Sequence, residues 1–138
     1  MPDPKTLPQV FSVPCHALPN DAHYAWLGRA ERLLVAFEHS LPAPSAATPV
    51  PSLGFILMVA DYLWDRCREE ADFTKLDVQG FVAHNHVLLC VEGVAASFAM
   101  TLTAFYGFLA ASGELDAALA KDVAAQLSAA AIQLGQRS

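Results

Sequence analysis

The chain has 138 residues, a length typical of one domain that can bury a core without metals or disulfides. Its composition is 54% hydrophobic and 16% charged, the formal net charge is −6, and its eight Lys and Arg residues are scattered. Because nucleic acids need a basic patch and anionic membranes attract positive charge, this balance argues against both partners.

The cysteines and the N-terminal segment predict a cytoplasmic protein. Three cysteines, Cys15, Cys67 and Cys90, lie far apart and form no C-x-x-C pair, which is typical of reduced thiols. Residues 1–19 lack the basic and apolar regions of a signal peptide. They contain five prolines, so we expect an extended arm.

Two helices joined by a proline-rich loop are expected in the first half of the chain. The first begins near Asn20 or Asp21, either of which can accept a backbone N–H group as a cap, and stops before Pro42. The loop at 40–52 contains four prolines, and we interpret it as a connector within one domain. The second helix is expected to start at a Ser52 cap and to continue to about Asp72.

The segment 74–92 has two interpretations. As a helix, it begins with a Thr74 cap and places apolar residues at helical spacing. As a strand, 81–91 is a short apolar run. We favour the helix, because no second strand is visible and a lone strand leaves its backbone groups unsatisfied. The alternative is an α+β fold in which one short strand at 81–91 pairs with the N-terminal arm or with another chain.

Residues 93–113 carry no charge, and this length could cross a membrane. However, small residues predominate, and neither flank contains Lys or Arg. As a helix, the segment would also have two different faces, one with large apolar residues and one with small residues. The large apolar face contains Val94, Phe98, Leu102, Phe105 and Leu109. The small-residue ridge contains Ala95, Ala99, Thr103, Gly107 and Ala111. We therefore predict no membrane span but a central helix at about 94–112, surrounded by the other helices of a soluble bundle.

The last helix is expected at 114–134, and Gly135 is expected to end it. Small side chains on the last two helices predict a close antiparallel pair that is short of bulky apolar surface. A second copy would supply that surface, so we expect a homodimer. The predicted fold is an all-α domain at 1–138, a small bundle of four to five helices around the central one.

A line of carboxylates on the second helix is the first candidate site. Asp61, Asp65, Glu69 and Asp72 follow one another at spacings of four, four and three residues, so one helix would place them on one face. Carboxylate oxygens suit Mg²⁺, and such a site would suit a metal-dependent hydrolase. The competing interpretation, which we favour, is a solvated face with ion pairs at helical spacing.

A second candidate metal site contains His84, His86 and Cys90. On a helix, His86 and Cys90 lie one turn apart and could share a soft metal ion, whereas on a strand all three residues point the same way. Their spacing matches no established zinc motif. The competing interpretation is two half-buried histidines near a buried thiol.

A third candidate is a ligand pocket between helices that carry aromatic residues. Its expected lining is Trp26, Tyr62, Trp64, Phe105 and Tyr106. Aromatic walls can enclose a flat ligand. Aromatic residues at helical spacing also form ordinary cores, and we favour that interpretation.

The sequence contains no phosphate-binding loop, nucleophile elbow or H-E-x-x-H motif, and it requires no cofactor. We therefore expect a non-enzymatic helical protein, a dimer that acts by binding another protein. The alternatives are a small-molecule binder with the aromatic pocket and the metal-dependent hydrolase.

Overall fold

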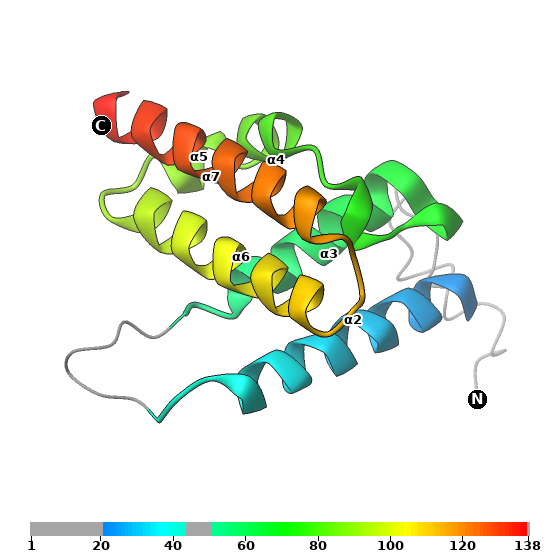
Figure 1. The fold of residues 1–138 in the computed structure, drawn as a ribbon. Coiled ribbons are helices and arrows are strands. Elements are labelled where there is room, and N and C mark those ends of the chain that lie inside the picture. The colour runs from blue at the N-terminus through cyan, green and yellow to red at the C-terminus, as the bar shows by residue number, and fades with distance from the viewer. Residues whose placement is uncertain (1–20, 44–50, 138) are drawn as a thin grey trace, which may run out of the picture.

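The computed structural model describes residues 21–43 and 51–137, and every regular element in these ranges is helical (Figure 1). The elements are α2 (Asp21–Ser40), α3 (Gly54–Cys67), η1 (Arg68–Glu70), η2 (Phe73–Lys75), α4 (Val78–His84), α5 (His86–Leu89), α6 (Val94–Ala111) and α7 (Ala117–Arg137). The all-α prediction is confirmed. The strand alternative is wrong, because α4 and α5 occupy most of 81–91. The arm at 1–19 and residues 44–50 of the proline-rich loop lie outside the described ranges.

α2 begins and ends where the sequence predicts. Its buried side chains, Trp26, Ala30 and Phe37, recur at helical spacing and turn one face toward the core. The helix ends ahead of Pro42, whose ring cannot continue the helical hydrogen bonding. The Trp26 Nε1–H group donates to the Ala60 carbonyl at 2.9 Å, which ties α2 to α3.

α3 is shorter than expected at both ends. Ser52 does not cap it, and the Ser52 backbone N–H donates instead to the Thr101 hydroxyl of α6 at 2.9 Å. At its other end, the helix stops after Cys67 rather than near Asp72. The cause is Arg68, whose φ of 52° is left-handed and cannot continue a right-handed helix.

The expected helix at 74–92 is divided into three short pieces. Asp72, not Thr74, caps η2, because its Oδ1 atom accepts the Thr74 N–H at 2.8 Å. α4 ends at His84; the next residue, Asn85, has a φ of −112° and a ψ of 24°, and α5 follows with only one turn. The Asn85 side chain donates to the Phe81 carbonyl at 3.0 Å, which stabilises this break. The described residues therefore contain six α-helices rather than four or five.

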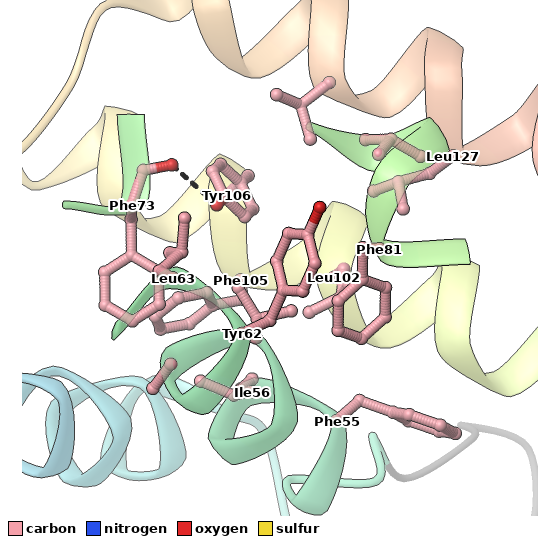
Figure 2. Close-up of a cluster of buried hydrophobic side chains, with 14 of the residues drawn as sticks. Phe55, Ile56, Tyr62, Leu63, Phe73, Phe81, Leu102, Phe105, Tyr106 and Leu127 are labelled. Atoms are coloured by element: carbon pink, nitrogen blue, oxygen red, sulfur yellow. Dashed lines mark hydrogen bonds between the residues drawn. The ribbon is translucent and has the colours of Figure 1, made fainter. Parts of the chain in front are cut away.

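α6 is the central helix, and its large residues form the middle of the core (Figure 2). Four of them are almost fully buried: Phe98, Leu102, Phe105 and Leu109. Gly113 follows the helix with a φ of 83°, as expected at a helix end. α7 packs antiparallel beside α6 (Figure 1), which confirms the predicted close pair. However, α7 begins only at Ala117 and passes through Gly135, so the prediction that Gly135 ends it is wrong.

Candidate functional site

The outer side of α6 is uncharged and open to solvent. Four residues on it are exposed, and we call them the α6 open face: Ala96, Thr103, Gly107 and Ala111. A Cβ atom added to Gly107 would meet no other atom within 4 Å. By length and composition α6 could span a membrane, yet only 44% of its 18-residue apolar window is buried inside the fold. The described residues therefore cover the large-residue side of α6 and leave much of its small-residue ridge uncovered.

A second exposed apolar surface surrounds α5. Val87 is 87% exposed, and Leu88 and Val91 are also exposed; we call these three residues the α5 edge. They line a shallow depression of about 510 Å³. The rest of its lining is Ala83, His84, Asn85 and His86. Another shallow depression, of about 500 Å³, lies along α2 between Gly28 and Ala36. Apolar side chains at the α5 edge contribute little to the core and are available for contact with another molecule.

Of the predicted His and Cys ligands, the structure brings two together. His86 and Cys90 lie one helical turn apart, and Cys90 Sγ is 3.4 Å from His86 Nε2 and 3.7 Å from Nδ1. His84 lies before the Asn85 break, and its ring packs instead on Tyr62, with 5.6 Å between ring centroids. Within residues 21–43 and 51–137, no three His, Cys, Asp or Glu side chains converge where they could hold one metal ion.

The predicted carboxylate line is divided by the end of α3. Asp61 and Asp65 are exposed on the helix, whereas Glu69 lies in η1 beyond its end. Partial burial and then the Asp65 charge raise the pKa of Asp61, while the nearby His23 lowers it. The His23 ring stacks on Trp64 with centroids 4.4 Å apart. Two carboxylates are therefore close, and the use of this line as a metal site stays a prediction.

The predicted aromatic lining lies in the core. All five residues are buried: Trp26, Tyr62, Trp64, Phe105 and Tyr106. Phe73 joins three of them, because its ring centroid lies 5.0 Å from that of Trp26, 5.1 Å from Phe105 and 6.4 Å from Tyr106. Tyr62 lies apart from this group, against Phe81 (Figure 2). None of the five lines either depression described above. Their role in ligand binding stays a prediction.

The two buried tyrosines differ in how their hydroxyl groups are satisfied. The Tyr106 hydroxyl donates to the Phe73 carbonyl at 2.7 Å (Figure 2), and burial followed by the Asp72 charge raises the pKa of Tyr106. The Tyr62 hydroxyl is buried and has no hydrogen-bond partner among the described residues. Gly80 makes room for it, because a Cβ atom there would collide with the Tyr62 hydroxyl.

An ion-pair cluster at Arg29 joins three distant parts of the chain, and sequence analysis did not identify it. The Arg29 guanidinium contacts Asp72 Oδ2 at 3.1 Å and Glu114 Oε2 at 3.3 Å. Partial burial raises the pKa of Asp72, but hydrogen bonds from Thr74 and the Arg29 charge outweigh it, so the pKa lies below its ordinary value. The cluster holds α2, the turn before η2 and the α6–α7 turn together. No local pattern signals it, because its members are 43 and 85 residues apart.

No family model matches the chain, and neither a curated protein nor a solved structure matches it.

Proposed function

We propose that this protein is a cytoplasmic, non-enzymatic interaction protein that forms a dimer and acts by binding another protein. The observation that carries the proposal is the α6 open face, an exposed helix surface without a charged side chain. Water-facing helix surfaces normally carry charged and polar residues. An uncharged one is better explained by a partner that covers it.

A second copy of the chain is the occupant that suits this face. Thr103, Gly107 and Ala111 recur every four residues, and their small side chains would let another helix backbone approach closely. In a two-fold dimer the same patch meets itself, so a flat, uncharged strip is self-complementary. No charged side chain lies between Gly93 and Gly113, so no like charges would meet within this contact.

The α5 edge supports the second part of the proposal, the binding of another protein. Val87, Leu88 and Val91 are exposed apolar side chains that lie on α5 and in the turn after it. Exposed apolar residues in a contiguous group mark interaction sites more often than isolated ones do. The dimer would then use α6 for self-association and the α5 edge for its partner.

The dimer is tested by measuring the molar mass of the full chain by size-exclusion chromatography with light scattering, without detergent. The proposal predicts a dimer for the wild-type chain and a monomer for Gly107→Leu, because a large side chain would separate the two helices. The matched control is Ala125→Leu on the exposed side of α7, which should stay dimeric.

Gly107→Leu should fold normally, since the space beside Gly107 is empty in one copy. Circular dichroism and thermal unfolding check this point. A monomeric wild-type chain, a dimeric Gly107→Leu chain, or a chain that stays in solution only with detergent would each contradict the proposal. The last result would instead show that lipid covers α6.

A further inference from the structure

His86 and Cys90 are a pair of metal-binding side chains in direct contact at the surface. His86 begins the single turn of α5 and Cys90 follows it, and the Cys90 backbone N–H donates to the His86 carbonyl at 3.0 Å. This hydrogen bond fixes their one-turn spacing. The His86 side chain is exposed and the Cys90 side chain is half-buried, so an ion could reach both from solvent.

We propose that His86 and Cys90 form a two-ligand site for a soft monovalent metal ion, Cu(I). Thiolate sulfur is a soft ligand that selects Cu(I), and imidazole nitrogen accepts copper as well. Cu(I) is stable with two ligands, unlike Zn²⁺, which takes four in structural sites. The absence of a third converging ligand among the described residues therefore disfavours Zn²⁺ but does not count against Cu(I).

The two side chains are near enough to share an ion after a small movement of the exposed His86 ring. A first-row metal bonds sulfur at roughly 2.3 Å and imidazole nitrogen at roughly 2.0 Å, so two donors of one ion lie at most about 4.3 Å apart. Two-coordinate Cu(I) prefers a nearly linear arrangement, in which its donors lie close to that limit, whereas Cys90 Sγ and His86 Nε2 are 3.4 Å apart in the metal-free chain. Because Sγ is almost as close to Nδ1, it lies beside the ring face. A turn of the exposed imidazole about its Cβ–Cγ bond would aim a nitrogen lone pair at the ion.

The surroundings favour a soft ion over a hard one. The depression beside the pair is lined by Val87, Leu88 and Val91 and contains no carboxylate. Hard cations such as Mg²⁺ bind best to carboxylate oxygens, and no carboxylate lines this depression. Binding is a simple exchange: the Cys90 thiol proton leaves to solvent as the copper–sulfur bond forms, neutral His86 adds its lone pair, and no electron is transferred.

The experiment measures Cu(I) binding to a full-length Cys15→Ser/Cys67→Ser chain, in which Cys90 is the remaining thiol. Cu(I) is held reduced without oxygen, and a coloured chelator competes for it. We expect one Cu(I) per chain. His86→Ala should weaken binding on the order of 100-fold, the gain expected from joining two binding groups on one scaffold. His84→Ala is the matched control and should leave affinity unchanged.

Two further measurements keep the test independent of folding defects. A Cys15→Ser/Cys90→Ser chain retains only the half-buried Cys67, and its weaker binding should not respond to His86→Ala. Ag(I), a diamagnetic substitute, should shift the imidazole NMR resonances of His86 but not those of His84.

The proposal would be overturned if His86→Ala left the Cu(I) affinity of the Cys15→Ser/Cys67→Ser chain unchanged, since the thiol would then bind alone. It would also be overturned if Ag(I) did not shift the His86 resonances. Tight one-to-one Zn²⁺ binding would overturn the assignment to Cu(I). Because these residues lie outside α6, a negative result would leave the proposed dimer unaffected.

Discussion

The two sides of α6 are both uncharged, but only one of them is buried in the core. On the inner side, Phe98, Leu102 and Phe105 are buried and pack against other helices of the chain. On the outer side, Thr103 and Gly107 are exposed to solvent, although this side carries no charged residue either. Hydrophobic burial explains the inner side completely. The outer side contributes little to folding, so its lack of charge requires another explanation, which we propose is association.

The largest expected contrast comes from truncating one residue on each side of α6. Phe105 is fully buried, with its ring centroid 5.4 Å from that of Phe37, so Phe105→Ala should lower the free energy of unfolding by about 3–5 kcal/mol. Thr103→Ala on the α6 open face should change it by less than about 0.5 kcal/mol. Urea denaturation at a concentration where the chain is monomeric measures both. Similar losses for the two variants would show that the outer side is also packed.

A second contrast separates two buried tyrosines that differ in hydrogen bonding. Tyr106→Phe leaves the Phe73 carbonyl without its donor, so it should cost about 1–3 kcal/mol. Tyr62→Phe removes a hydroxyl that has no partner among the described residues, so it should be neutral or stabilising. The same denaturation experiment compares them. A loss for Tyr62→Phe as large as that for Tyr106→Phe would reveal a partner of Tyr62.

Replacing glycine by alanine should change the free energy of unfolding in opposite directions at two positions. Gly80→Ala forces a Cβ atom into the Tyr62 hydroxyl and should cost about 1–3 kcal/mol through overpacking. Gly107→Ala meets open space and should stabilise the monomer by about 0.5–1 kcal/mol, because alanine favours the helix. Thermal unfolding of monomeric samples measures both changes. If Gly107→Ala destabilises the monomer, the outer side of α6 is already covered within one chain.

The smallest expected effects concern two carboxylates with opposite pKa shifts. The lowered pKa of Asp72 means that it stabilises the fold above its unfolded pKa, and that this contribution is lost as pH falls through its folded pKa. At pH 7, Asp72→Asn should therefore cost about 0.2–1 kcal/mol, the range for a solvent-exposed ion pair.

Asp61 should behave in the opposite way. Its raised pKa means that the charged form slightly destabilises the fold, and that this cost is relieved as pH falls through the folded pKa. Asp61→Asn should thus be neutral or stabilising at pH 7, by less than about 0.5 kcal/mol. Both differences from the wild type should shrink toward pH 3 in urea titrations. A stabilising Asp72→Asn would contradict the role of the Arg29 cluster.

The sequence predicts the helical elements well where periodicity and proline act locally. The apolar spacing of Trp26, Ala30 and Phe37 and the ring of Pro42 suffice to define α2. The end of α3 was not predictable in this way. Arg68 adopts a positive φ that its residue type does not favour, so its local preference could not predict this helix end.

The site was only partly predictable, for a related reason. Helical spacing alone brings His86 and Cys90 together, so the sequence identified that pair. The Asn85 break directs His84 elsewhere, and no spacing rule reveals such a break. Contacts between distant segments, such as Arg29 with Glu114, leave no periodic trace at all.

Cross-linking between copies tests most directly whether a second chain covers the α6 open face. In a chain whose three native cysteines are replaced by serine, Gly107→Cys is oxidised under mild conditions, and Ala125→Cys serves as the control. The account predicts a disulfide-linked dimer at Gly107→Cys and none above background at Ala125→Cys. No dimer at Gly107→Cys, or the same yield at both positions, would contradict it.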